Sequence, residues 1–248
     1  MKRLLAAAAL AVVAACGGTT APTPPGAGGT YSSPHFTFNY TALDAGNIAA
    51  TAAALEREYD RIVADLRAGS MPPVTVTFYG DHGAMEAATR AAAGAVPAWA
   101  AGLITSATQI HLMSPNLPSW GPYERMLSHL VHEFAHCVSM KVNPRIANNP
   151  RWLWESVAIY EAGQAVDLSR LDYMRASNPP SFESLAGLEQ TRMYDVGYSI
   201  AEFIVARWGA GALADLIVAG GDTAGVLGIG LADFEREWFA FARQRYNF

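Results

Sequence analysis

The sequence has only two cysteines, few charged residues and, after its first 15 residues, no long apolar run. Charged residues make up 16% of the 248 positions and form no basic cluster, which argues against nucleic acid as a partner. No later apolar run reaches the ~20 residues that a membrane-spanning helix needs. No segment repeats at a fixed period, so a single globular domain is the simplest expectation.

The start of the chain is typical of a bacterial export signal. Two basic residues precede an apolar run over residues 4–13,. The run ends in the sequence VAAC, which resembles the lipobox of bacterial lipoproteins and predicts lipid attachment at Cys16. An ordinary secretory signal cleaved near Ala15 is the alternative. Both alternatives export the protein, and the first predicts a lipoprotein of the cell envelope, held to the membrane by its lipid.

Composition divides the rest of the chain into a tether and one domain. Residues 16–30 are rich in Gly, Thr, Ala and Pro and predict a flexible tether that buries no core,. Residues 31–248 are long enough for one domain, expected to be a monomer. Without the signal, 15 basic residues face 22 acidic ones, a net charge of about −7. If Cys16 carries lipid, Cys137 has no disulfide partner and is expected to be a buried free thiol.

The hydrophobic pattern predicts an α+β fold, with a small mixed sheet over residues 31–120 and a mostly helical part over 121–248,. Alternating apolar residues predict strands near 35–40, 74–79 and 107–113. Helical periodicity predicts helices over 45–67, 82–93, 122–140, 150–162, 191–208 and 231–247. Residues 94–103 are expected to be a loop.

The stretch HEFAH, residues 132–136, is the strongest chemical motif. Residues four apart on a helix share a face, so His132 and His136 can bind one metal ion. Glu133 lies near enough to contact a water on that ion, but points away from binding it. Because two histidines can also fall on one helix face by chance, the motif alone leaves both interpretations open.

A glutamate further along the chain extends the motif. Eighteen residues separate His136 from Glu155, which lies in WLWESVAIY, residues 152–160. This arrangement resembles the gluzincin zinc metallopeptidases, and its spacing matches the aminopeptidase-N family, whose third-ligand helix reads WLNEGFAxY. Trp154 and Ser156 stand where that pattern has Asn and Gly. The order of elements is similar to the small peptidase MA-like branch of these enzymes.

The resemblance implies a zincin-like metallopeptidase fold with one Zn²⁺ per chain. His132, His136 and Glu155 would bind the ion, which leaves a position open for water. Glu133 would act as general base when that water attacks a peptide bond. The implied function is a lipid-anchored zinc metallopeptidase acting on peptide or protein substrates. An inactive zinc-binding lipoprotein that binds a peptide or envelope partner is the alternative.

Two further expectations come from the same resemblance. The segment 194–209 resembles the family's Y-x-x-G helix, which implies that Tyr194 donates a hydrogen bond to the oxyanion,. Tyr198, one turn later, is the alternative donor, and a purely structural tyrosine is the third possibility. In such folds an edge strand beside the zinc helix pairs with an extended substrate, and residues 107–113 are expected to be that strand.

Two nearby features are expected to have no part in the chemistry. GAME, residues 83–86, resembles the G-x-M-E-N motif that holds a substrate's amino terminus, but Ala87 replaces the Asn and the pattern predicts a helix. With no residue to anchor an α-amino group, an endopeptidase is expected. His129, three residues before His132, is expected not to bind the metal.

Overall fold

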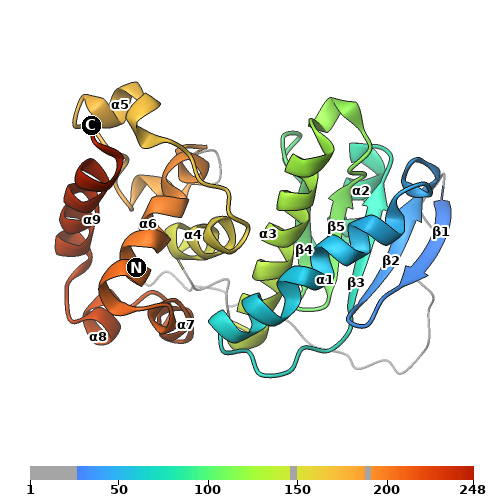
Figure 1. Ribbon diagram of the computed structural model, residues 1–248, viewed down its shortest axis with the longest axis horizontal. Coiled ribbons are helices and arrows are strands. Elements are labelled where there is room, and N and C mark those ends of the chain that lie inside the picture. Colours follow the sequence, from blue (N-terminus) through green and yellow to red (C-terminus); the bar gives the residue numbers. More distant parts are fainter. Residues whose placement is uncertain (1–26, 146–149, 188–190) are drawn as a thin grey trace, which may run out of the picture.

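The computed structural model describes residues 27–145, 150–187 and 191–248, so Cys16 and the export segment lie outside the described residues. One small mixed sheet precedes a helical part (Figure 1), which confirms the α+β class at a coarse level. Within the described ranges, no helix combines the length and apolar character needed to cross a membrane.

The sheet part contains five strands and the first two helices. Each predicted strand and helix is present, with small shifts in its bounds. The strands are β1 (Ala27–Ser32), β2 (Phe36–Thr41), β3 (Val74–Tyr79), β4 (Gly102–Ser106) and β5 (Gln109–Met113). The helices are α1 (Ile48–Asp65), α2 (His82–Ala93), α3 (Tyr123–Val142), α4 (Arg151–Glu161), α5 (Asp172–Arg175), α6 (Arg192–Trp208), α7 (Gly211–Val218), α8 (Thr223–Leu227) and α9 (Leu231–Tyr246).

The strand order is β1-β2-β3-β5-β4, with β2, β3 and β5 parallel and the two outer strands antiparallel to their neighbours. The expectation that 107–113 forms the sheet edge was wrong, because β5 pairs with both β3 and β4. The edge strand is β4, which begins inside the predicted loop 94–103. All five of its residues are half-buried, so it lacks the alternation that would have marked it as a strand.

The opposite edge of the sheet contains a strand where composition predicted part of the tether. Residues 27–30, assigned to the tether, form most of β1 and pair with the outer edge of β2. A side chain at Gly28 would collide with the carbonyl of Thr41. Glycine here therefore permits close strand pairing instead of giving a flexible linker.

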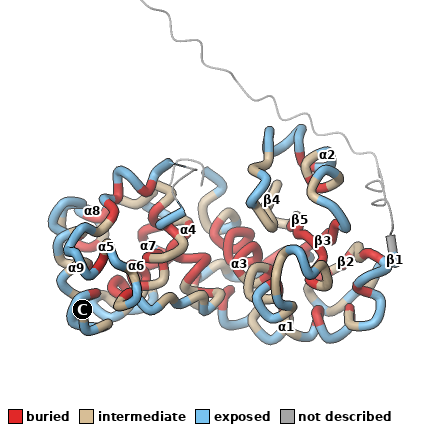
Figure 2. Tube along the Cα trace, turned by 90° about the horizontal axis from the view of Figure 1, so that it is seen from above, coloured by how far each residue is buried: buried red, intermediate tan, exposed pale blue. Residues whose placement is uncertain are grey.

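One face of the sheet is apolar and fully buried. Its side chains come from the three parallel strands: Phe36, Phe38, Val74, Val76, Phe78, Ile110 and Leu112. Phe134 of α3 packs onto this layer, with ring centroids 5.1 Å from Phe36 and 5.6 Å from Tyr59 of α1. This packing fixes the position of α3 on the sheet, and Figure 2 shows the buried centre of α3 beside the strands.

Helix α3 lies between the sheet and the helical part (Figure 1). An ion pair makes a second connection between the two parts: Arg61 of α1 reaches Glu161 of α4, with Nη1 2.5 Å from Oε2. A second guanidinium nitrogen donates to the backbone oxygen of Glu161 at 2.6 Å. The carboxylate of Glu161 is fully buried, so Arg61 supplies the charge that it needs there.

The buried Phe134 gives a prediction for stability. Phe134→Ala should lower the free energy of unfolding by about 3–5 kcal/mol, because it leaves a cavity between α3, α1 and the sheet. Urea unfolding followed by circular dichroism measures this change. Leu43→Ala, at a side chain that is 53% exposed, is the control and should change stability by less than about 0.5 kcal/mol. Equal effects of the two substitutions would contradict the packing described here.

Candidate metal centre and cleft

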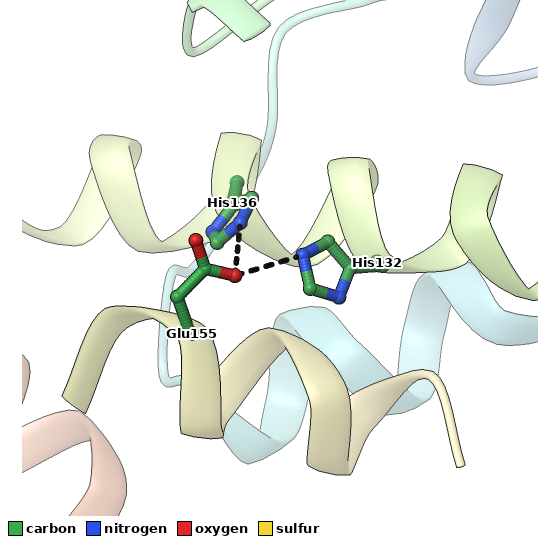
Figure 3. Close-up of side chains that lie close together, drawn as sticks. All are labelled: His132, His136 and Glu155. Atoms are coloured by element: carbon green, nitrogen blue, oxygen red, sulfur yellow. Dashed lines mark ion pairs between the residues drawn. The ribbon is translucent and has the colours of Figure 1, made fainter. Parts of the chain in front are cut away.

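Two neighbouring helices bring together the three predicted metal ligands. His132 and His136 lie one turn apart on α3 and are 5% exposed, and Glu155 comes from the middle of α4. Figure 3 shows both imidazoles and the carboxylate pointing toward one another. Among the described residues, this is the one group of three side chains able to hold a metal ion.

The separations within this group fit a metal site. Oε2 of Glu155 lies 3.3 Å from Nε2 of His132 and 3.8 Å from Nε2 of His136, yet it makes no hydrogen bond to any described residue. Two atoms bound to zinc at about 2.0–2.1 Å in a tetrahedral arrangement are themselves about 3.3 Å apart. The donors therefore converge as metal ligands do, and a buried carboxylate oxygen without a hydrogen bond is available for an ion.

A glutamine absent from the sequence predictions orients the first histidine. Nδ1 of His132 donates to Oε1 of Gln164 at 3.0 Å, which fixes the ring so that Nε2 is directed at Glu155,. Gln164 follows the end of α4 and belongs to no motif, so the sequence carried no signal for it. Burial lowers the pKa of His132, but the carboxylates of Glu155 and Glu133 outweigh burial and leave that pKa raised.

The second histidine is oriented by stacking. The rings of His136 and Trp154 are 4.2 Å apart between centroids and nearly parallel, at 12°. Nδ1 of His136 is buried and has no hydrogen-bond partner among the described residues. Trp154, the departure from the family pattern, therefore takes over the orienting role that a hydrogen-bond acceptor usually has beside a metal-binding histidine. Burial lowers the pKa of His136 to about 4 and keeps the ring neutral.

The carboxylate of Glu155 is surrounded by positive and polar groups. Beside the two imidazoles, Nε of Arg151 lies 3.7 Å from Oε1, and the hydroxyl of Tyr194 donates to the same oxygen at 3.4 Å. Burial alone would raise the pKa of Glu155, but the histidines lower it well below its usual value. Glu155 is therefore an anion ready to bind a cation.

Glu133 faces a cavity of about 280 Å³ beside the ligands. Its lining comes from the loop before β4 and the start of β4, from the turn before α3, from α3 and from α6: Trp99, Ala100, Ala101, Gly102, Trp120, Arg125, His129, His132, Glu133 and Tyr194. A side chain at Gly102 would lie 3.2 Å from Oε1 of Glu133 and 2.5 Å from Leu112, so glycine makes room for the glutamate. Burial raises the pKa of Glu133 to about 7.

The two candidate tyrosines of α6 lie in different surroundings. Tyr194 lines the cavity, bonds to Glu155 and stands edge-on to Trp99. Tyr198 instead packs against Tyr160, with ring centroids 5.2 Å apart, and does not line this cavity. Burial raises the pKa of Tyr194 above its usual value, so its hydroxyl keeps the proton that a hydrogen-bond donor needs. The geometry therefore favours Tyr194.

Small residues explain how α6 comes so close to the ligands. A side chain at Gly197 would lie 2.6 Å from Ile159 and 3.4 Å from the Cα of Ser156, both on α4. Gly197 is the glycine of the Y-x-x-G pattern, and Ser156 is next to Glu155 in the chain. The close approach of the two helices therefore brings Tyr194, one turn before Gly197, to the ligand carboxylate.

Three remaining expectations concern single residues. His129 lines the cavity, and the group of described residues that could hold a metal does not include it. Burial, with smaller contributions from the charges of His132 and Arg125, lowers its pKa to about 4. Cys137 is a buried free thiol, as expected. GAME begins α2 and does not line the cavity.

Comparisons of this chain with known protein families, with curated proteins and with solved structures found no match.

Removal of the ligands or of their supports should reduce metal binding. Glu155→Gln and His136→Ala should each lower the metal content from about one ion per chain to near zero. Gln164→Leu and Trp154→Leu should weaken metal affinity by about 10-fold or more, while Trp154→Phe, which keeps an aromatic stack, should weaken it less. Elemental analysis and competition with a chromogenic chelator measure both quantities. Unchanged affinity in Trp154→Leu would show that stacking does not orient His136.

Proposed function

We propose that this protein is a zinc metallopeptidase of the gluzincin kind, with a zincin-like fold related to the peptidase MA-like branch. One observation carries the proposal: the donor atoms of His132, His136 and Glu155 converge next to a cavity that also contains Glu133 and Tyr194. Two imidazoles and one carboxylate are a typical donor set for catalytic zinc, whereas magnesium and calcium prefer oxygen ligands alone.

The residues have distinct roles in the proposed hydrolysis. A zinc ion held by the two histidines and Glu155 would lower the pKa of bound water and polarise a peptide carbonyl. The Glu133 carboxylate takes the proton of the attacking water and passes it to the leaving amine. The hydroxyl of Tyr194 donates a hydrogen bond to the oxyanion that develops on the carbonyl oxygen. Gln164 and Trp154 hold the imidazoles in place during these steps.

The free edge of β4 is the proposed binding site for the substrate backbone. β4 pairs with β5 on one side only, and its first residue, Gly102, lines the cavity beside Glu133. An extended peptide can add to such an edge through main-chain hydrogen bonds. Apart from Glu133, the described residues that line the cavity include no carboxylate to hold a free amino terminus, so we expect endopeptidase activity. Export of the protein and lipid attachment at Cys16 remain predictions from the sequence.

Digestion of a peptide library tests the proposed activity. The zinc-loaded protein should cleave peptides within the chain, and removal of the metal with a chelator should abolish cleavage. Glu133→Gln should keep about one zinc per chain but lose at least about 100-fold in turnover, because the variant has no base. Mass spectrometry of the products and elemental analysis measure these outcomes. A zinc-loaded protein that cleaves no peptide would favour the inactive, peptide-binding alternative.

A pair of matched tyrosine variants tests the oxyanion donor. Tyr194→Phe should lower turnover by about 100-fold without changing zinc content, since it removes one hydrogen bond made in the transition state. Tyr198→Phe, on the same helix but packed against Tyr160, should keep nearly full turnover. Steady-state kinetics on a cleaved library peptide compares the two. The reverse order of effects would assign the role to Tyr198.

A further inference from the structure

One positive side chain in the cavity wall has no part in the proposed chemistry. Arg125 lies on α3, two turns before His132, and its exposed side chain lines the cavity with Trp99 and Trp120. At 1.5 Å per residue, the seven residues from Arg125 to His132 span about 10 Å. An extended peptide covers that distance in about three residues.

A hydrogen bond to a backbone carbonyl holds the guanidinium of Arg125 in place. Its Nη2 donates to the carbonyl oxygen of Trp120 at 2.5 Å. A side chain at Gly121, whose φ is +110°, would collide with the same guanidinium, so this glycine leaves the space that the arginine occupies. The charge is therefore oriented before any ligand arrives, which lowers the entropic cost of binding.

No carboxylate of the described residues forms an ion pair with Arg125. Arg61 and Arg151, by contrast, each contact a buried glutamate. A guanidinium has five N–H donors in a planar fork, and the bond to Trp120 uses one of them. Donors therefore remain for a ligand, and their geometry matches a carboxylate.

The walls of the cavity strengthen such a contact. Trp99, Ala100, Ala101 and Trp120 line the same cavity as the charge and contribute apolar surface to it. An ion pair beside apolar walls is less screened than one in open water. Arg125 is also the only lysine or arginine among the described residues that line this cavity, in a chain whose net charge is −5.

We propose that Arg125 forms a carboxylate-binding subsite of the cleft, which selects peptides with a carboxylate two or three residues from the bond opposite Glu133. The carboxylate comes either from an Asp or Glu side chain or from the carboxyl terminus of the peptide. This inference rests on the proposed function for its substrate class, but it requires only that peptides bind in the cleft.

The test measures peptide binding to the zinc-loaded Glu133→Gln protein, so that no hydrolysis is needed. Fluorescently labelled library peptides are compared in matched pairs, Glu against Gln at each position. A second set compares a free carboxyl terminus with its amide. Fluorescence anisotropy should show roughly 10-fold tighter binding of the carboxylate form, as expected for one charged hydrogen-bonded contact. The set that shows the difference identifies the source of the carboxylate.

Variants of Arg125 assign this preference to one side chain. Adding Arg125→Gln should remove the preference, and Arg125→Lys, which keeps the charge without the fork, should retain part of it. Arg57→Gln, at an exposed arginine of α1 outside the cavity, is the matched control and should change nothing. Equal binding of carboxylate and amide peptides, no binding at all, or an undiminished preference in Arg125→Gln would each overturn the subsite.

The outcome is separable from that of the proposed function. If binding shows a preference that depends on Arg125 but the wild-type protein cleaves no peptide, the subsite is supported and the peptidase is rejected. Zinc-dependent cleavage with no preference for carboxylates would support the peptidase and overturn the subsite.

Discussion

A charged carboxylate kept out of water is the constraint on which the rest of this molecule depends. Glu155 is 9% exposed, and removing an ion from water costs several kcal/mol unless other charges and hydrogen bonds compensate. The two imidazoles of α3, Arg151 and the hydroxyl of Tyr194 supply that compensation. Three helices therefore meet at this carboxylate, and each places a polar group that the neighbouring helices could not supply.

The close packing of α4 on α6 depends on small residues where the two helices meet. Gly197 and Ser156 leave no bulk between the two helix backbones, so the phenol of Tyr194 reaches the ligand carboxylate. Gly102 has the same role at the edge of the sheet, where it leaves space for Glu133. A methyl group at Gly197 would press on Ile159 and Met193, and one at Gly102 would press on Leu112 and crowd the carboxylate of Glu133.

The sequence predicted well which three side chains come together, because a helix fixes the relation between residues four apart, and the spacing to Glu155 added an independent constraint. It predicted the strands less well. β4 has no alternating pattern, and the strand order depends on pairing between distant segments, so the edge was assigned to the wrong strand. Gln164 comes to the site through three-dimensional proximity alone, since it belongs to no motif with a characteristic spacing.

The ion pair between Arg61 and Glu161 restrains the position of α4 together with the contacts of Glu155. Glu155 and Glu161 are six residues apart, about 9 Å along α4. Glu161 connects this helix to α1 of the sheet part, and Glu155 connects it to α3. Two contacts at separate points along α4 restrain the orientation of the helix more than a single contact would. Because α6 packs closely on α4, these two contacts also help to fix the position of Tyr194 beside the ligands.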